Sequence, residues 1–294
     1  MSFKVRIVHA LVRTGSVLPL AWLHALARPL AALARALRTR EARVAARNVE
    51  LAFPQLDPSE RTRLTHESLR QTAMSLTELP TLWGTPENAL GLVRDVHGKD
   101  HLSAALARNQ GVLIAAPHLG SWELLNLWLS RQAPMVILYR VPQRAEFDQF
   151  LRDARGAFGA EPVRADPAGV RTLFRRLKEG RMVGILPDQR PKSGEGAWAS
   201  FFGEPAKTMT LLGRLAHKSH APVLLAWAQR LPESRGFDIH IEPLADAIAD
   251  ADPIVSTHAL NAAIECEVRK CPEQYQWTYK RFGMRQHADD ALPY

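Results

Sequence analysis

The stretch from Gly111 to Leu129, GVLIAAPHLGSWELLNLWL, constrains the fold of this chain more than any other. Its first part, Gly111 to Ala116, is a short apolar run that ends at Pro117, which is typical of a strand buried on both faces of a sheet. After the turn PHLGS, the apolar residues of WELLNLWL recur at helical spacing. The stretch therefore predicts a buried strand, a tight turn and a helix, and in open α/β sheets binding and catalytic groups gather at such strand ends.

Two side chains of this turn and helix can do chemistry together. His118 lies in the predicted turn, Ser121 can cap the helix, and Glu123 falls in its first turn, where negative charge is favoured. A neutral imidazole can take a proton from a hydroxyl when a carboxylate holds its other ring nitrogen. No serine stands in a G-x-S-x-G setting here, so the substrate's own hydroxyl is the expected nucleophile. A structural interpretation, a loop histidine and a glutamate at a helix dipole, stays open at this point.

The size and charge of the chain set its class and its kind of partner. Its 294 residues fit one large α/β domain with an appendage, or two small domains. A net charge of +8 points to an anionic partner, such as phosphorylated lipid, a membrane face, an acidic carrier protein or nucleic acid. The spacing of Cys266 and Cys271 matches no zinc or redox motif and indicates two reduced thiols.

Residues 5–47 read as one or two helices, interrupted near Gly15 and Pro19 and again at Pro29. Leucines and Trp22 alternate there with many arginines, which is the pattern of a helix lying in a membrane interface. A helix packed on its own domain with a solvated basic face would show the same pattern. The run from Thr14 to Ala27 lacks charged side chains but is too short to span a bilayer.

Strand and helix signals alternate through the rest of the chain. Strands are expected at residues 92–96, 134–139, 181–186, 222–229 and 237–243, and helices at 98–109, 144–158, 169–179, 207–217 and 254–270. This alternation predicts a parallel or mixed sheet flanked by helices.

Polar residues follow two more of the predicted strands. Arg140 comes directly after MVILY, and Asp188 and Gln189 come after MVGIL. If these strands are parallel, the three side chains emerge at the same sheet edge as His118. Arg140 could then grip a phosphate or a developing oxyanion, or it could pair with a nearby surface acid.

Aromatic residues mark two later segments. In the Gly-rich stretch KSGEGAWASFFGEPAKT, Phe201 and Phe202 either fold back on the core or line an apolar tunnel, and Thr208 caps or nearly caps a helix. Trp122 is a further candidate for such a tunnel. The segment CPEQYQWTYKRF brings Arg281 close to aromatic residues.

Together, these motifs make the chain resemble the bacterial lipid A biosynthesis acyltransferases, the late lauroyl or myristoyl transferases. The motifs occur in family order and are ARNVELAFP at 46–54, HLGSWE at 118–123, LYR at 138–140, DQ at 188–189, FFGEPAKT at 201–208 and PEQYQWTYKRF at 272–282. The sequence departs from the family after Arg140, where VPQRAEF replaces the usual residues.

The resemblance implies an α/β fold of the glycerolipid acyltransferase type, a mixed sheet flanked by helices. It implies a membrane-associated helical segment at residues 1–45, an acyltransferase domain at 46–286 and a tail at 287–294. The implied activity moves a fatty acyl group from acyl carrier protein to a hydroxyl of a lipid A precursor, at the cytoplasmic face of the inner membrane. Neither a cofactor nor a metal ion is expected, and no nucleic acid partner.

The resemblance also assigns roles to residues. His118 is expected to be the general base and Glu123 its orienting partner. The other residues are expected to contact substrate or shape its pocket, and they are Arg140, Asp188, Gln189, Trp122, Phe201, Phe202, Thr208 and Arg281.

Two alternatives remain open. The same chemistry could acylate a lysophospholipid or an ornithine-type lipid. Alternatively, the chain could bind anionic lipid without catalysis; nucleic acid binding is less supported, because no helix-turn-helix, aromatic RNA platform or zinc finger is legible. The acyl length, the acylated hydroxyl and the choice between carrier protein and coenzyme A are not set by the sequence.

Overall fold

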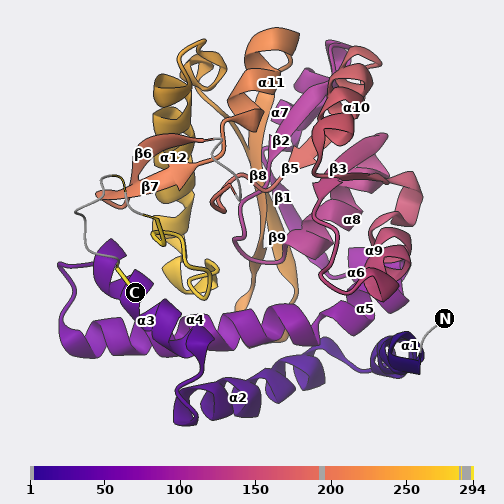
Figure 1. Cartoon of the computed structure of the whole chain (residues 1–294). Coiled ribbons are helices and arrows are strands. Elements are labelled where there is room, and N and C mark those ends of the chain that lie inside the picture. The colour runs from indigo at the N-terminus through magenta and orange to yellow at the C-terminus, as the bar shows by residue number, and fades with distance from the viewer. Residues whose placement is uncertain (1–2, 192–195, 285, 287–292) are drawn as a thin grey trace.

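A seven-stranded mixed β-sheet lies at the centre of the fold (Figure 1). The computed structural model describes residues 3–191, 196–284, 286 and 293–294. The sheet order is β1-β9-β8-β2-β5-β3-β4, and neighbours are parallel except β8 and β9. In chain order the strands are β1 (Val93–His97), β2 (Val112–Ala115), β3 (Met135–Tyr139), β4 (Glu161–Arg164), β5 (Met182–Ile185), β8 (Val223–Arg230) and β9 (Phe237–Pro243). The predicted mixed sheet is confirmed.

Helices cover both faces of this sheet, and the central strand β2 shows why. Its Val112 and Ile114 pack in one hydrophobic cluster with α7 (Lys99–Ala107) and α8 (Trp122–Gln132), while Leu113 and Ala115 pack in the other. That second cluster includes α10 (Pro167–Lys178), α11 (Leu211–Ser219) and α12 (Pro253–Lys270). The remaining short helices are α5 (Leu79–Gly84), α6 (Pro86–Leu90) and α9 (Asp148–Arg155). The apolar run of β2 is therefore buried on both sides, as its sequence predicts.

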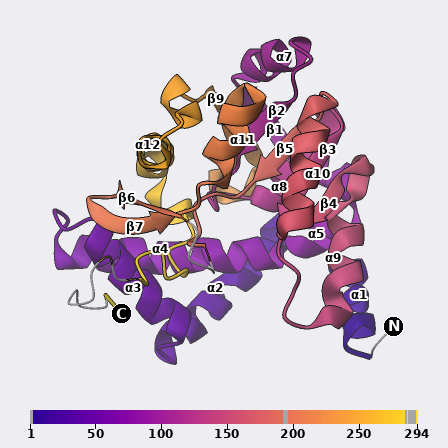
Figure 2. The ribbon, with the colours of Figure 1, turned by 45° about the horizontal axis from the view of Figure 1, so that its top comes forward.

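The N-terminal helices form a separate layer below the ends of the strands (Figures 1 and 2). They are α1 (Phe3–Gly15), α2 (Leu20–Ala36), α3 (Arg40–Ala52) and α4 (Pro58–Thr77). Helix α4 begins with a capping box. The Asp57 side chain accepts from the Glu60 backbone N–H, and the Glu60 side chain accepts from the Asp57 backbone N–H. Within the described ranges, none of the helices combines the length and apolarity that crossing a bilayer requires.

Two local expectations from the sequence are corrected. The expected break at Pro29 does not occur, because α2 runs through this residue while Ala27 and Ala31 pack into the core on either side of it. The segment containing Phe201 is a hairpin of β6 (Ala197–Phe201) and β7 (Glu204–Thr208) rather than a loop. Both residues of its turn, Phe202 and Gly203, have positive φ, as tight hairpin turns require. Residues 192–195 of the expected Gly-rich loop lie outside the described residues.

The predicted tail lies largely outside the described residues. Of its eight positions, the structure describes Pro293 and Tyr294. The Pro293 carbonyl accepts from Arg47 Nε at 2.8 Å, and the Tyr294 hydroxyl donates to Asn48, so this end of the chain contacts α3.

Candidate active site

His118 follows β2 at the carboxyl edge of the sheet, next to strands that supply further polar groups. In the sheet order, β5 lies beside β2 and β3 lies beside β5, all three parallel. Their ends therefore bring His118, Gln189 and Arg140 to one cavity, as the sequence predicts. Asp188 sits directly behind His118 and is buried.

Backbone contacts hold the turn that carries His118. The Gln276 N–H donates to the His118 carbonyl at 3.0 Å, and the Ser121 N–H donates to the Ala228 carbonyl at 2.8 Å. Gly120 has a positive φ of 63°, and a Cβ there would come within 1.9 Å of the Ala228 carbonyl oxygen. Only glycine fits this close approach, so the turn presents the imidazole from a fixed position.

The carboxylate that holds His118 is Asp188. Its Oδ1 lies 2.8 Å from His118 Nδ1, and its Oδ2 accepts from the His118 backbone N–H at 2.9 Å. Burial alone would raise the pKa of Asp188, but the attraction to His118 and the hydrogen bonds from it outweigh burial and lower that pKa. An ionised Asp188 can only accept, so Nδ1 carries the proton and Nε2 keeps a lone pair.

The free nitrogen of the imidazole faces an amide. Gln189 Nε2 lies 3.1 Å from His118 Nε2 and 3.1 Å from Gln276 Oε1, so one amide group donates to both. The Trp122 ring lies beside the imidazole, with ring centres 5.1 Å apart. In this arrangement a hydroxyl that replaces the Gln189 amide would meet a ring nitrogen able to accept its proton.

Glu123, the expected partner of His118, makes other contacts. Arg155 Nε donates to Glu123 Oε1 at 3.0 Å, and Trp83 Nε1 donates to Oε2 at 3.3 Å. Among the hydrogen bonds of the described residues, none joins Glu123 to His118. The reason is geometric: the first turn of α8 directs this carboxylate toward the end of α9. The two form an ion pair at the cavity wall in which Glu123 is buried and Arg155 is partly exposed, and the attraction to Glu123 raises the pKa of the Arg155 guanidinium.

The cavity in front of His118 has a volume of about 330 Å³, at the lower end of the range for small-ligand sites. Its lining divides into a polar part and an apolar part. The polar and charged lining residues are His118, Glu123, Asn126, Tyr139, Arg140, Arg155 and Gln189, and the other lining residues are Trp122, Ile137, Leu138, Leu151, Ala165, Ile185, Leu186 and Met209. The cavity can thus hold an apolar chain beside a reactive polar group.

The hairpin aromatics lie in the core and not in this cavity. Phe201 and Phe202 are buried, and Phe202 packs edge-on against Phe53 and Trp277, with ring centres 5.1 and 5.5 Å apart. Of the two alternatives for these residues, folding back on the core is the observed one.

Thr208 and Arg281 also lie away from the cavity and hold the fold together. Thr208 ends β7, so it does not cap a helix; the N-cap of α11 is Thr210. Arg281 donates to the Thr208 hydroxyl at 2.7 Å and to the Lys207 carbonyl at 2.8 Å. Asn261 of α12 donates to the same hydroxyl at 3.0 Å. This cluster ties the hairpin to α12 and to the C-terminal segment.

Sequence reasoning missed two residues that shape the site. Arg155 is one arginine among many in a predicted helix, so nothing in the sequence distinguishes it. Gln276 lies in a motif that the sequence singled out, but its contact with Gln189 depends on the path of the C-terminal segment. Across the described ranges, no group of three or more His, Cys, Asp or Glu side chains is placed to hold a metal ion.

Comparison with known proteins identifies a family and several relatives. Residues 3–283 match the model of a family described as bacterial lipid A biosynthesis acyltransferase. The chain is 28% identical over 264 residues to the lipid A biosynthesis palmitoleoyltransferase of Escherichia coli K12, covering 90% of this chain and 85% of that protein. It is 26% identical over 258 residues to the lipid A biosynthesis lauroyltransferase of the same organism, covering 87% and 83%. A phosphatidylinositol mannoside acyltransferase of Mycobacterium tuberculosis is 28% identical over 176 residues, covering 58% of this chain and 54% of that protein.

Proposed function

Because the chain belongs to the bacterial lipid A biosynthesis acyltransferase family and is therefore an acyltransferase, we propose that it acylates a hydroxyl of a lipid A precursor. The donor in this proposal is the thioester of a fatty acid with acyl carrier protein. The net charge of +8 favours an acidic carrier and an anionic acceptor.

The observation that carries the proposal is the His118–Asp188 pair at the edge of a partly apolar cavity. Asp188 keeps the proton on Nδ1, so Nε2 removes the proton of the acceptor hydroxyl as its oxygen attacks the thioester carbonyl. The carbon–sulfur bond then breaks, and the imidazolium returns its proton to the leaving thiolate. This series of reaction steps needs no covalent enzyme intermediate and no metal ion.

The arginines of the cavity are suited to the charge that develops on the carbonyl oxygen. Arg140 and Arg155 both line the cavity, and a guanidinium placed beside the carbonyl oxygen can stabilise an oxyanion. Arg140 is exposed and donates to the Arg190 carbonyl at 3.3 Å. Arg155 is held by Glu123, so the role we propose for Glu123 is to position this arginine rather than the imidazole. The apolar walls would hold the acyl chain.

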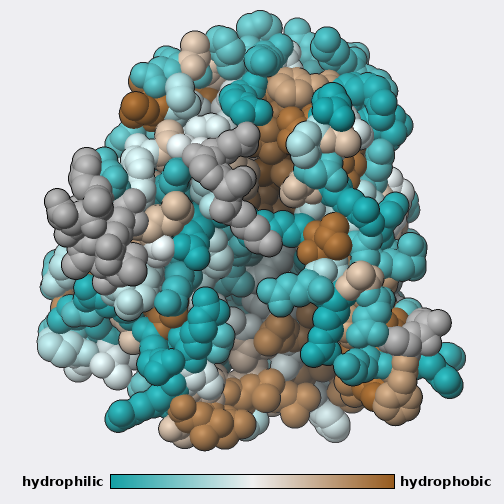
Figure 3. All heavy atoms as spheres, viewed as in Figure 1, coloured by the Kyte–Doolittle hydropathy of each residue, from teal (hydrophilic) through white to brown (hydrophobic). Residues whose placement is uncertain are grey.

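We also propose that the N-terminal layer rests on the cytoplasmic face of the inner membrane. Large apolar side chains of α1, of α2 and of the residues next to these helices stay exposed, and apolar surface gathers along the lower edge of Figure 3. They are Phe3, Ile7, Leu11, Val17, Trp22, Leu26, Leu30, Leu33 and Leu37. An exposed stripe of this kind fits an interfacial helix.

Replacing His118 with alanine tests the catalytic proposal. Loss of a general base is expected to lower kcat by about 10²- to 10⁴-fold, measured as acyl transfer from acyl carrier protein to a lipid A precursor. His258→Ala, an exposed histidine of α12, is the matched control and should keep wild-type activity. Near-normal turnover by a folded His118→Ala variant would refute the mechanism.

The same assay with other substrates tests the substrate assignment. Transfer to a lysophospholipid at a rate equal to that with the lipid A precursor would favour the alternative acceptor. If kcat/KM with acyl-coenzyme A equals that with acyl-acyl carrier protein, the enzyme does not prefer the carrier protein as donor.

A further inference from the structure

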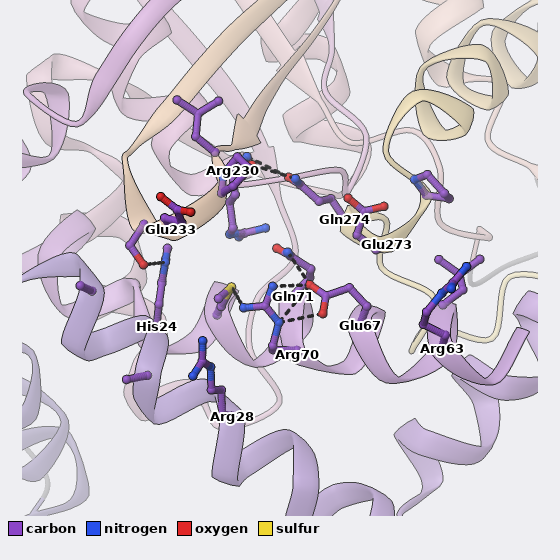
Figure 4. A pocket seen from close by; sticks show the side chains of 18 of the residues that line it. His24, Arg28, Arg63, Glu67, Arg70, Gln71, Arg230, Glu233, Glu273 and Gln274 are labelled. Carbon is purple, nitrogen blue, oxygen red and sulfur yellow. Dashed lines mark hydrogen bonds and ion pairs between the residues drawn. The ribbon is translucent and has the colours of Figure 1, made fainter. Parts of the chain in front are cut away.

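A groove between α2 and α4 lies outside the cavity that holds His118. It consists of a larger lobe of about 940 Å³, drawn in Figure 4, and a smaller lobe of about 470 Å³. The two lobes share Arg28 of α2 and Glu67, Arg63 and Arg70 of α4 in their walls. We call the two lobes together the α2–α4 groove.

Positive charge is concentrated in the smaller lobe of the groove. Its basic lining residues are Arg28, Arg35, Arg63, His66 and Arg70. Among the described residues that line it, Glu67 is the only carboxylate, and Arg70 already binds it, with Nε 2.8 Å from Oε2. The larger lobe, in contrast, has as many glutamates as arginines in its walls. The smaller lobe therefore has a surplus of positive charge that its own residues do not neutralise.

Three of these arginines make no direct side-chain contact with a carboxylate within the part of the chain that the structure describes, although Glu67 attracts Arg28 and Asp57 attracts Arg63 at longer range. Arg28, Arg35 and Arg63 are exposed, and no ion pair or hydrogen bond of their side chains is found among the described residues. Figure 4 shows Arg28 extending from α2 toward α4, the helix that carries Arg70. Like charges that face one another across a groove repel, and an anion between them would turn this repulsion into attraction.

The spacing of the arginines matches the pitch of the two helices. Arg28 and Arg35 are seven residues apart, and so are Arg63 and Arg70, so each pair lies about two turns apart on one face of its helix. The two packed helices thus place two pairs of basic side chains along the same groove. Ser59 and Thr62 add hydroxyl groups to its wall.

The orientation of α2 indicates what kind of anion the groove receives. At 100° per residue, Arg28 and Arg35 lie roughly opposite the exposed stripe that contains Trp22, Leu26 and Leu33. If that stripe rests in the bilayer, the groove opens on the far side of α2, about 10 Å from the apolar face. A phosphate next to the acyl chains of a bilayer lipid does not reach so far, whereas a phosphate on a large sugar headgroup does.

We propose that the α2–α4 groove binds a phosphate group on the headgroup of the acceptor lipid, with Arg28, Arg35 and Arg63 as its ligands. This rests on the proposed function, which supplies a lipid acceptor. The guanidinium group suits phosphate because its planar fork of donors can bind two oxygens at once.

The groove also lies close to the catalytic turn. Its larger lobe extends to Gln274, whose carbonyl accepts from the Gly120 N–H at 3.1 Å, and Gly120 is two residues beyond His118. A headgroup whose phosphate is bound by the arginines of the smaller lobe could therefore extend along the larger lobe toward this turn.

The test compares two double variants of the full chain in detergent micelles. R28Q/R63Q removes two groove arginines; R43Q/R171Q removes two exposed arginines that line neither lobe, and it is the matched control. The acceptors are a phosphorylated lipid A precursor and the same lipid after phosphatase treatment. For R28Q/R63Q, KM for the phosphorylated acceptor should rise about tenfold or more, with kcat unchanged. Its KM for the dephosphorylated acceptor, and both KM values of the control, should stay at the wild-type level.

Other outcomes would overturn the proposal. An unchanged KM, or an equal rise with both acceptors, would show that the groove does not recognise phosphate on the acceptor. Binding to phosphatidylcholine vesicles with and without phosphatidic acid is the second measurement. A loss confined to R28Q/R63Q on the phosphatidic acid vesicles, with normal acceptor KM, would assign the groove to bilayer lipid instead. Wild-type turnover separately tests the proposed function, so the two failures are distinguishable.

Discussion

At the scale of single residues, the partner of His118 decides how the site works. Asp188 holds the protonated Nδ1 at 2.8 Å, which fixes the tautomer that leaves Nε2 free. Asp188→Asn can present an amide nitrogen to the ring and thereby favour the wrong tautomer. We expect kcat to fall by up to about 10⁴-fold with little change in KM, as in other His–Asp pairs. Steady-state acyl transfer with purified variants measures this.

Glu123→Gln supplies the comparison for that experiment. This change leaves the half-buried Arg155 without its carboxylate, so we expect a lower thermal stability as well as reduced activity. Asp188→Asn should, in contrast, lower kcat even in a fully folded protein, because the wrong tautomer of His118 is enough to remove the base. If Asp188→Asn kept normal kcat while Glu123→Gln lost it in a folded protein, Glu123 would be the orienting residue after all.

The cluster around Arg281 yields a prediction of a different kind. Thr208→Val removes a buried hydroxyl that accepts from Arg281 and Asn261, and it should lower the free energy of unfolding by about 1–3 kcal/mol. Because this cluster does not line the His118 cavity, kcat and KM should stay unchanged. Chemical denaturation and acyl-transfer assays on the same sample measure both. A raised KM without a loss of stability would return Thr208 to the substrate site.

How far the sequence could predict these residues depends on the distance over which the contacts form. His118, Gln189 and Arg140 were predictable, because they follow buried strands and parallel strands bring their ends to one edge. The pairing of His118 with Asp188 rather than Glu123 was not predictable. Glu123 is close in sequence and is therefore the obvious partner, whereas Asp188 follows a neighbouring strand. The direction of Glu123 depends on how α8 packs against α9, and no local pattern records that packing.

At the scale of elements, one buried glutamate connects the N-terminal layer to the catalytic turn. Glu78 follows α4 and accepts from Arg230 of β8 at 2.6 Å, and from Ser121 at 3.2 Å. His24 of α2 lies 2.7 Å from the same carboxylate. Ser121 therefore uses its hydroxyl to bind Glu78 and not to cap α8. Four elements meet at this carboxylate.

Glu78→Gln should therefore weaken the whole fold. The change leaves the charge of Arg230 buried without its partner, and we expect the free energy of unfolding at neutral pH to fall by about 3–5 kcal/mol. Urea denaturation measures this loss. Glu87→Gln, an exposed position of α6, is the matched control and should have no measurable effect.

The pH dependence of the stability lost in Glu78→Gln provides a second check. Burial alone would raise the pKa of Glu78, but Arg230 and His24 outweigh burial and lower it below the usual 4.5. At this carboxylate the folded protein then binds fewer protons than the unfolded chain. Its contribution to the free energy of unfolding is therefore complete above pH 4.5, the usual pKa of the group, and is lost as the pH falls through the lower pKa of the folded protein. The stability difference between wild type and Glu78→Gln should narrow below pH 4.5. A constant difference down to acid unfolding would contradict this origin.

Elements were predictable where their own pattern was strong and were missed where packing decides. The buried strands and the longer helices followed from apolar runs and helical spacing. The β6–β7 hairpin was missed because its Gly-rich, aromatic sequence reads as a loop, and its pairing is fixed by Phe202 and Gly203 in the turn. The continuity of α2 through Pro29 depends on core contacts on both sides of the proline, which local rules do not weigh.

At the scale of the whole molecule, the layer of N-terminal helices gives the protein two different surfaces. The exposed apolar stripe of α2 lies on the lower edge of Figure 3, and the groove arginines lie on the other side of the same helix. We therefore expect apolar contact and charge to act separately, with the stripe binding the bilayer and the groove binding the acceptor. The net charge of +8 adds a long-range attraction to anionic membranes that salt weakens.

Charge introduced into the stripe should release the protein from membranes. Leu26 and Leu33 are 51% and 55% exposed, so L26E/L33E disturbs little of the core while removing apolar area from the bilayer contact. Flotation with vesicles of phosphatidylethanolamine and phosphatidylglycerol should show a partition coefficient lower by about tenfold or more. The control is I254E/V255E, which places the same two charges at exposed apolar positions at the start of α12, away from the N-terminal layer (Figure 1). An equal loss of vesicle binding in both variants would show that the change in net charge causes the effect. Full binding by L26E/L33E would mean that another surface of the protein binds the membrane.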